Sequence, residues 1–339
     1  MNAERLAEAT LGALPGVAAV GILRGDRMEV AVRRRDDAGA ALNASDPSLA
    51  AEPVFEIGSV SKVFTGLLVA QRVERGELRL DQSLGELLSD RVRFDSEQTR
   101  QITLKQLLTH TACLRTWPTN PARLPVDKQL LYDRHRLWSI LGSTAVDRTP
   151  PCETNYSNYA YAVLGELLAE RAQAAWEALV QREIIQPIGM TSSAQTLSRD
   201  LDKRLAPAFA EKERTKNWEM NAFAGAGGLR STATDLLAFS QELLRGRQGR
   251  FGAAAERLVA PLAPYRTGGS RIGYGVLLPA APARVWAHNG VTGGYLAEWM
   301  VWPDSREAVV ILVSNSAAPS HRIAQALVAQ TWTDATGKN

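Results

Sequence analysis

Residues 55–66 read FEIGSVSKVFTG and place a serine and a lysine three positions apart at the start of an apolar segment. Apolar residues at positions 60, 63, 64, 67 and 68 recur with the period of one helical face, and Gly76 is the expected end of that helix. Residues three apart lie on the same side of a helix, so the hydroxyl of Ser59 and the amine of Lys62 can meet. A serine that opens a helix also has a backbone N–H without a helical partner, which can stabilise an anion. These are the components of an acyl-transfer nucleophile, although an S-x-x-K spacing alone also arises by chance.

The composition is that of an ordinary globular protein. The 339 residues are 45% hydrophobic and 22% charged, with a formal net charge of +3. The one short basic run, at residues 33–35, indicates solvated surface rather than nucleic-acid binding. No window of 18 consecutive apolar residues predicts a membrane span. The first residues lack a basic segment followed by an apolar one, so we expect a cytoplasmic protein; a periplasmic or secreted one is the alternative if a leader has been removed.

The potential metal ligands are scattered. The two cysteines, Cys113 and Cys152, fit no metal-binding spacing, and the four histidines lie at positions 110, 135, 288 and 321. The sequence therefore predicts neither a metal site nor a cofactor.

The order of the predicted elements favours an α/β fold. Strands are expected at both ends of the chain, as a hairpin of residues 17–23 and 28–32 and as three late strands at 285–288, 296–302 and 308–314. Helices are expected between them, followed by a closing helix at 321–333. This order predicts one antiparallel sheet built from both termini and flanked by helices. Residues 1–58 and 227–339 would form the sheet region, and residues 59–226 a mainly helical region, together making one catalytic unit.

Several of the inserted helices have recognisable ends. Asp81 is the expected cap of a short helix that ends at Leu88, and Thr103 with Gln106 forms a capping-box pattern. Helices are also expected at residues 158–174, 176–183 and 233–244, whereas 113–135 should be mostly loop and the small residues at 222–228 should be flexible.

Two further clusters carry side chains suited to catalysis. Residues 155–158 read NYSN at the entrance to a predicted helix, and residues 288–295 read HNGVTGGY between two predicted strands. Each also has an ordinary structural interpretation. Tyr156 could be a core aromatic and Asn158 a helix cap, and His288-Asn289-Gly290 could be a hairpin turn.

Taken together with Ser59 and Lys62, these clusters resemble the serine β-lactamase and penicillin-binding-protein superfamily, whose signature includes S-x-x-K. The similarity runs from about Gly16 to Thr333. It is greatest to the branch of class C β-lactamases, D-alanyl-D-alanine carboxypeptidases, D-aminopeptidases and β-lactamase-like esterases. In this branch the second motif is Y-x-N and the third is K-T-G or H-x-G. Three more segments match it in order: LLTHT at 107–111, PIGM at 187–190 and GGLRST at 227–232.

The resemblance implies an α/β sandwich with the active site in the cleft between the sheet and the helical region. It implies that Ser59 is the nucleophile of an acyl-enzyme and that Lys62 and Tyr156 share the acid–base chemistry. If the two groups lie side by side, each is expected to lower the pKa of the other, so that Tyr156 is available as phenolate. By the same resemblance, Asn158 holds Lys62 and the substrate amide.

The third motif supplies the remaining expected site residues. The resemblance implies that His288, Asn289 and Gly290 contact substrate, and that the N–H groups of Ser59 and Val291 form the oxyanion hole.

The sequence also departs from the pattern of the branch. His288 replaces the lysine, and an unperturbed histidine is mostly neutral above pH 7, so a substrate carboxylate loses a permanent cationic partner. Val291 is bulkier than the small residue expected beside the oxyanion. Pro150-Pro151 stands in place of Pro-Gly, and Ala112-Cys113 in place of Ser-Gly.

We therefore expect a serine hydrolase that acts on a small ester, amide or peptide, with an esterase or peptidase favoured over a β-lactamase. The alternatives are a biosynthetic acyltransferase or cyclase that uses the same acyl-enzyme, and a non-catalytic binding homologue. The presence of Ser59, Lys62 and Tyr156 together argues against the last. The sequence leaves the substrate and the oligomeric state open.

The cysteines also lie in loops that border the cleft in this superfamily, so Cys113 and Cys152 could approach disulfide distance. We expect two unpaired thiols because no secretion signal is visible in the sequence.

Overall fold

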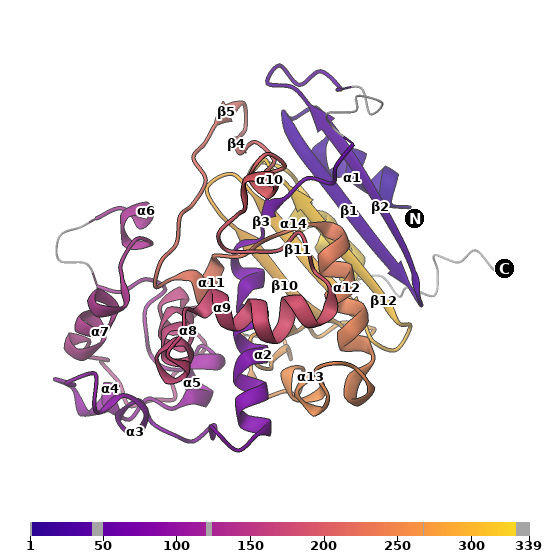
Figure 1. Ribbon diagram of the computed structural model, residues 1–339. Coiled ribbons are helices and arrows are strands. Elements are labelled where there is room, and N and C mark those ends of the chain that lie inside the picture. The colour runs from indigo at the N-terminus through magenta and orange to yellow at the C-terminus, as the bar shows by residue number, and fades with distance from the viewer. Residues whose placement is uncertain (1, 43–49, 120–123, 267, 330–339) are drawn as a thin grey trace.

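The computed structural model describes residues 2–42, 50–119, 124–266 and 268–329. At its centre is an antiparallel sheet of eight strands (Figure 1). Its strands are β1 (Gly16–Arg24), β2 (Arg27–Arg35), β7 (Ala263–Pro264), β8 (Arg271–Ile272), β9 (Leu277–Leu278), β10 (Trp286–Val291), β11 (Leu296–Trp302) and β12 (Glu307–Val313). Across the sheet they follow the order β2-β1-β12-β11-β10-β9-β8-β7.

The two ends of the chain meet inside this sheet. Strand β1 pairs with β12 in a register that runs from Ala18 opposite Val313 to Arg24 opposite Glu307. Every residue of β12 is buried, as are the first eight residues of β1, because both faces of these central strands are covered. The prediction of one antiparallel sheet built from both termini is confirmed.

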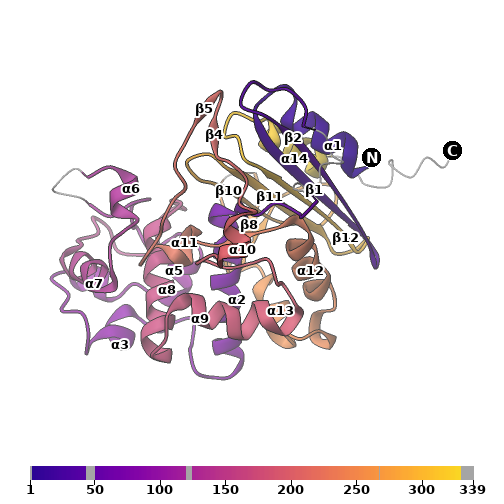
Figure 2. The same ribbon diagram turned by 45° about the horizontal axis from the view of Figure 1, so that its top comes forward.

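Alternate residues of the central strands enter two different cores. On one face, helices α1 (Ala3–Leu11) and α14 (Ser320–Ala329) pack on side chains such as Val20 and Met300. On the other face, side chains such as Trp299 join the large core that extends into the helices. Figure 2 shows α1 and α14 on one side of the sheet and the helical region on the other. Helix α1, capped by the side chain of Asn2, was not anticipated from the sequence.

The helical region is built around α2 (Ser61–Glu74), whose residues 61–72 are all buried. The expected single apolar face is therefore too narrow a description, since neighbours surround this helix. The other helices of the region and its connections are α3 (Leu84–Leu88), α4 (Glu97–Arg100), α5 (Leu104–Leu108), α6 (Val126–Gln129), α7 (Arg134–Ser143), α8 (Asn158–Ala172), α9 (Trp176–Val180), α10 (Arg199–Asp202), α11 (Ala224–Gly227), α12 (Ala233–Leu244) and α13 (Ala253–Leu258).

Short elements join these helices to the sheet. The chain enters α2 through β3 (Phe55–Glu56) and the 3-10 turn η2 (Gly58–Val60), and β3 pairs with β6 (Arg230–Ser231). A second small pair consists of β4 (Phe209–Ala210) and β5 (Glu213–Arg214). The remaining short helical segments are the π-helix η3 (Gln181–Ile185) and the 3-10 turns η4 (Gln186–Ile188) and η5 (Gly246–Gln248).

Some local predictions were wrong. Helix α3 is capped by Ser83 rather than Asp81, because the Ser83 side chain and Glu86 form a reciprocal capping box. The small residues at 222–228 are buried and include helix α11 rather than a flexible loop. Glycines allow α11 to lie against α8, since a Cβ on Gly225 would come within 2.9 Å of the Gly165 Cα. Strands β7 to β9 were not anticipated from the sequence.

The expectation of two free thiols was also wrong. Cys113 and Cys152 form a disulfide, with their Cα atoms 5.3 Å apart. The two loops lie side by side because their backbones are hydrogen-bonded. The Cys152 N–H donates to the Thr111 carbonyl at 2.9 Å, and the Asn155 N–H donates to the His110 carbonyl at 2.9 Å. The disulfide therefore ties the loop after α5 to the segment that carries Tyr156.

Candidate active site

Ser59 lies in η2, where the chain passes from the sheet region into the buried helix α2. Strand β10 approaches this turn so closely that only glycine fits at two positions. A Cβ on Gly290 would lie 2.0 Å from the Ile57 carbonyl oxygen, and a Cβ on Gly58 would lie 2.9 Å from the Val291 nitrogen. Gly58 also has a φ of 49°, which favours glycine. This contact brings the backbone of Ser59 and that of Val291 to the same cavities.

Lys62 is fully buried one turn further along the helix. Its Nζ lies 3.0 Å from Ser59 Oγ, 2.7 Å from Asn158 Oδ1 and 2.6 Å from the Ala226 carbonyl oxygen. No carboxylate forms a salt bridge with it within the described part of the chain. Burial therefore lowers the pKa of Lys62 well below its usual value. Asn158 occupies the expected position beside Lys62.

Tyr156 reaches Ser59 from the start of α8. Its hydroxyl is hydrogen-bonded to the Ser59 side chain, and its ring centroid lies 4.9 Å from Lys62 Nζ. Burial raises the pKa of Tyr156 above its usual value, more than the Ser59 hydrogen bond lowers it. The expectation that Lys62 makes Tyr156 available as phenolate was therefore wrong, because the loss of solvent on burial is the largest influence on the pKa of Tyr156.

His110 supports the loop that carries Tyr156. Its Nδ1 accepts a hydrogen bond of 3.1 Å from the Ser157 N–H, and its ring lies 4.6 Å from the Tyr156 ring. His110 is buried, and its pKa is lowered well below the usual value, first by burial and then by the nearby charge of Lys62. No role for His110 was expected from the sequence, although His110 belongs to the LLTHT segment.

His288 lies inside strand β10, so the hairpin-turn alternative for residues 288–290 was wrong. Its side chain is buried, and burial, together with the charge of Lys62, lowers the pKa to about 3. Its Nδ1 lies 2.7 Å from the Asn289 carbonyl oxygen, so Nδ1 carries the proton of the neutral ring. The sequence predicted that position 288 lacks a permanent positive charge. The buried His288 carries even less positive charge at neutral pH than an exposed histidine would.

Two unlike cavities meet at Ser59, Asn158 and Val291. The larger, of about 600 Å³, includes Tyr156 and Asn289, and it extends to strands β8 and β9 and to helix α14. The smaller, of about 190 Å³, is lined mainly by apolar side chains. Val291 is 54% exposed, so its extra bulk lies at the mouth of both cavities. The apolar lining consists of Trp117, Leu130, Trp218, Met220, Phe223 and Ala226.

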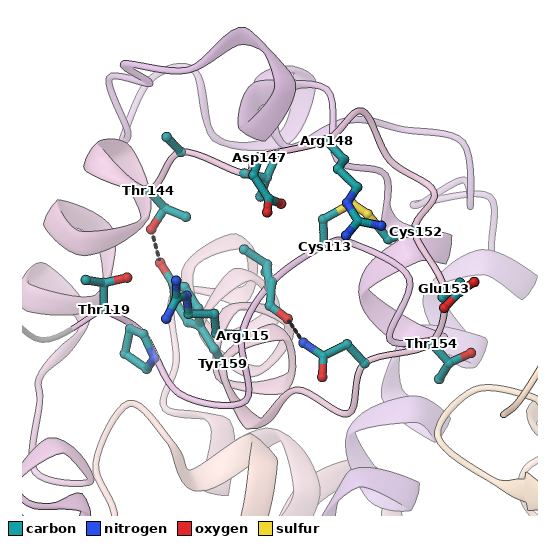
Figure 3. A pocket seen from close by; sticks show the side chains of 15 residues that line it. Cys113, Arg115, Thr119, Thr144, Asp147, Arg148, Cys152, Glu153, Thr154 and Tyr159 are labelled. Atoms are coloured by element: carbon teal, nitrogen blue, oxygen red, sulfur yellow. Dashed lines mark hydrogen bonds between the residues drawn. A yellow bond between two sulfur atoms is a disulfide. The ribbon is translucent and has the colours of Figure 1, made fainter.

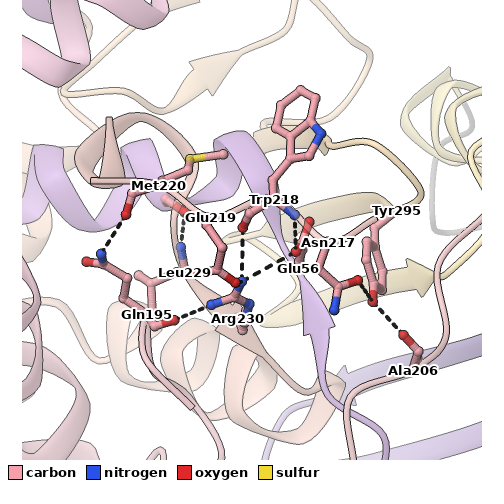
Figure 4. A network of polar contacts seen from close by, with 11 residues as sticks. Glu56, Gln195, Ala206, Asn217, Trp218, Glu219, Met220, Leu229, Arg230 and Tyr295 are labelled. Atoms are coloured by element: carbon pink, nitrogen blue, oxygen red, sulfur yellow. Dashed lines mark hydrogen bonds and ion pairs between the residues drawn. The ribbon is translucent and has the colours of Figure 1, made fainter. Parts of the chain in front are cut away.

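A buried polar network holds one wall of the smaller cavity (Figure 4). The Trp218 N–H donates to a Glu56 carboxylate oxygen at 2.8 Å, and Arg230 donates to the Trp218 carbonyl oxygen at 2.9 Å. Arg230 also donates to Glu219 at 2.9 Å. This network was not predicted from the sequence, although Glu56 lies within the segment 55–66 and Arg230 within the GGLRST segment.

A third cavity, of about 390 Å³, lies against the disulfide (Figure 3). It is lined by Cys113, Cys152 and Tyr159, among others, but not by Ser59. We therefore take the two cavities at Ser59 as the candidate substrate-binding cavities. Among the described residues, no helix has the length and apolar character that crossing a membrane requires.

The chain is similar to the class of proteins that have an active-site serine. The similarity lies in the fold and in the cluster formed by Ser59, Lys62 and Tyr156. The family model described as Beta-lactamase matches residues 3–331, so the chain belongs to the beta-lactamase family.

Individual relatives agree with this assignment. The D-alanyl-D-alanine-carboxypeptidase/endopeptidase AmpH of Escherichia coli (strain K12) is 28% identical over 194 residues, which cover 57% of this chain and 49% of AmpH. The chain thus matches about half the length of that relative. Penicillin-binding protein 4 of Amycolatopsis lactamdurans is 24% identical over 330 residues, covering 91% of this chain and 82% of the relative. A class C beta lactamase structure from Rhodobacter sphaeroides superposes with a TM-score of 0.80 at 18% identity, covering 99% of this chain and 100% of the other, and it shows the shared fold.

Proposed function

We propose that the protein is a serine hydrolase that cleaves an ester or amide bond through an acyl-enzyme on Ser59. The observation that carries this proposal is the environment of Lys62. A buried lysine without a carboxylate partner is favoured as the neutral amine. A neutral amine has two N–H donors, which the oxygens of Asn158 and Ala226 accept. Its lone pair is then directed at Ser59 Oγ, 3.0 Å away.

This arrangement separates the base from the acid. Lys62 takes the proton of the Ser59 hydroxyl as Oγ bonds to the substrate carbonyl carbon. The oxyanion forms beside the N–H groups of Ser59 and Val291. Tyr156, which retains its proton at neutral pH, donates it to the leaving oxygen or nitrogen as the scissile bond breaks. The Lys62 ammonium then returns a proton to Tyr156, and water releases the acyl group by the reverse sequence.

The same roles orient the substrate. Tyr156 lines the larger cavity but not the smaller one, so the leaving group belongs in the larger cavity. The acyl group then occupies the smaller cavity, whose aromatic lining suits a short apolar chain.

Within this class we propose an esterase or peptidase in preference to a β-lactamase. A β-lactam carries its carboxylate next to the scissile amide, where the family pattern has a lysine on the strand. The neutral, buried His288 supplies no charge there. A substrate carboxylate next to the scissile bond therefore gains little binding energy from His288. Esters or peptides without such a carboxylate are not at a disadvantage.

We also propose that the functional enzyme resides in an oxidising compartment, in place of the expected cytoplasmic location. The support is the Cys113–Cys152 disulfide, since such bonds persist mainly in secreted or periplasmic proteins.

The test is intact-mass analysis after exposure to a fluorophosphonate and to a panel of p-nitrophenyl esters. The native protein should gain one adduct, and Ser59→Ala should gain none while keeping its fold. Ser61→Ala is the matched control, because it removes a neighbouring buried hydroxyl that accepts from the Leu229 N–H and has no contact with Lys62 Nζ. Labelling that persists in Ser59→Ala would show that another residue is the nucleophile.

A further inference from the structure

The leaving-group cavity carries two arginines that have no place in the chemistry at Ser59. Arg266 and Arg271 line this cavity from the β7–β8 hairpin. No aspartate or glutamate lines the cavity among the described residues, so its charge is positive on balance.

Neither guanidinium is neutralised by the protein. Within the described ranges, no carboxylate lies within salt-bridge distance of Arg266 or Arg271, whereas most other arginines have such partners. Arg266 contacts the ring of Tyr265, with 5.3 Å between its Cζ and the ring centroid. The histidine of the cavity differs, because His321 Nδ1 lies 3.4 Å from the side-chain carboxyl group of Glu298. The two arginines are therefore the cations available to a ligand.

Their position differs from that of the third motif. His288 is buried and lines neither cavity at Ser59, whereas both arginines are exposed and line the larger one. Arg266 is nevertheless close enough to Tyr156 for its charge to favour the phenolate. An anion that reaches the two arginines must lie on the leaving-group side, some distance from the scissile bond.

We propose that Arg266 and Arg271 bind a carboxylate on the distal part of the leaving group and so determine specificity. This inference rests on the proposed function, because it takes the orientation of the substrate from Tyr156. Guanidinium groups bind carboxylates through paired N–H donors, which makes arginine suited to this role. The preferred substrate thus has a short apolar acyl group and a leaving group with an anion at its far end.

The test compares two butyrate esters of nearly equal size, those of 4-hydroxyphenylacetate and 4-hydroxyphenylacetamide. The methylene group insulates the phenol from the substituent, so the two leaving groups have similar reactivity. Native enzyme should prefer the carboxylate ester in kcat/KM by about fivefold, the upper range for solvent-exposed ion pairs. The preference should vanish in the double variant Arg266→Gln/Arg271→Gln and be partly restored by Arg266→Lys/Arg271→Lys, which keeps the charge but not the paired donors.

Two controls separate this effect from general electrostatics. Arg5→Gln removes one such charge from an exposed position on α1 and should keep the full preference. The butyrate ester of lactate, whose carboxylate is next to the scissile bond, should change in kcat/KM between native enzyme and the double glutamine variant only by the factor that the neutral phenyl ester shows, which is the factor expected from the effect of Arg266 on Tyr156. Thermal unfolding of each variant checks that the fold is intact.

The outcomes distinguish this inference from the proposed function. Equal turnover of the two phenyl esters, or a preference that survives the double variant, overturns the inference while adduct formation at Ser59 still supports the hydrolase. If Ser59 forms no adduct and no ester is cleaved, the proposed function fails. Binding of free 4-hydroxyphenylacetate and its amide, measured by ligand-observed NMR, then decides the arginine site. A carboxylate that binds no better than the amide overturns it.

Discussion

The helical side and the strand side of the site differ in their relation to Ser59. On the helical side, Lys62 and Tyr156 both contact the Ser59 hydroxyl and have pKa values shifted in opposite directions. On the strand side, His288 is neutral, and the one hydrogen bond recorded for its ring, among the described residues, is with its neighbour Asn289. In the proposed function and the further inference, bond cleavage and charge recognition are thus carried by separate parts of the molecule. The second can change or move to another element while the first remains.

The largest effects are expected on the helical side. Lys62→Ala and Tyr156→Phe should each lower kcat/KM by about 10²–10⁴, the usual range for loss of a general base or acid. The double variant should lose less than the product of the two factors, because the residues act as one unit. Steady-state kinetics with a p-nitrophenyl ester measure this, and fully multiplicative losses would count against a shared proton path.

The same kinetics should show a pH dependence that belongs to Lys62. The base is active when neutral, and its lowered pKa extends activity to lower pH than an ordinary lysine would allow. The kcat/KM of native enzyme should therefore rise with pH and level off well below the usual lysine pKa of about 10.4. A profile that still rises steeply at that pH would contradict a desolvated Lys62.

An intermediate effect is expected from the disulfide, which braces the helical side alone. Cys113→Ser/Cys152→Ser should lower the free energy of unfolding by about 3–4 kcal/mol, from the entropy of a loop of this length. The two cysteines are 39 positions apart. Without the disulfide, the loop that carries Tyr156 should also lose order, so kcat should fall. The affinity of Arg266 and Arg271 for a carboxylate should fall by a smaller factor. Denaturant unfolding and kinetics of both phenyl esters test the two parts of this expectation.

The smallest effect is expected on the strand side. His288→Lys should raise kcat/KM for a cephalosporin relative to a neutral ester by about three- to fivefold at most, since it restores a cation beside the scissile bond. Native enzyme should show no histidine titration of this ratio between pH 5.5 and 8.5, because the pKa of His288 is about 3. If native enzyme prefers the cephalosporin throughout this range, the esterase or peptidase proposal is wrong and the protein is a β-lactamase.

The site residues that could be predicted from the sequence are those for which a local pattern and the order of the family motifs agree. The spacing of Ser59 and Lys62 on a helix, and the position of Asn158 at the start of another, follow from short-range geometry. The raised pKa of Tyr156 could not be predicted, because it depends on burial by segments far apart in the chain. The division into residues 1–58 with 227–339 and residues 59–226 stays a prediction.

Other features left no clear trace in the sequence. Strands β7 to β9 have two residues each, too few for an alternating pattern, so Arg266 and Arg271 could not be placed at the cleft. The network of Glu56 and Arg230 depends on pairing between β3 and β6, which are separated by the whole helical region. The state of the two cysteines depends on redox conditions that composition does not reveal.

The contact between the two glycines at Ser59 has a consequence for how the enzyme loses activity. Gly58 precedes the helical region and Gly290 belongs to a late strand, yet their backbones approach within the space of a single methyl group. A separation of these segments by a fraction of a side chain would disperse the two N–H groups that we propose face the oxyanion, while most of the core stayed packed. Local openings of this kind require less free energy than global unfolding. In mild denaturant, inactivation should therefore precede the loss of helical structure, and catalysis would be the more sensitive gauge of whether the two regions are docked.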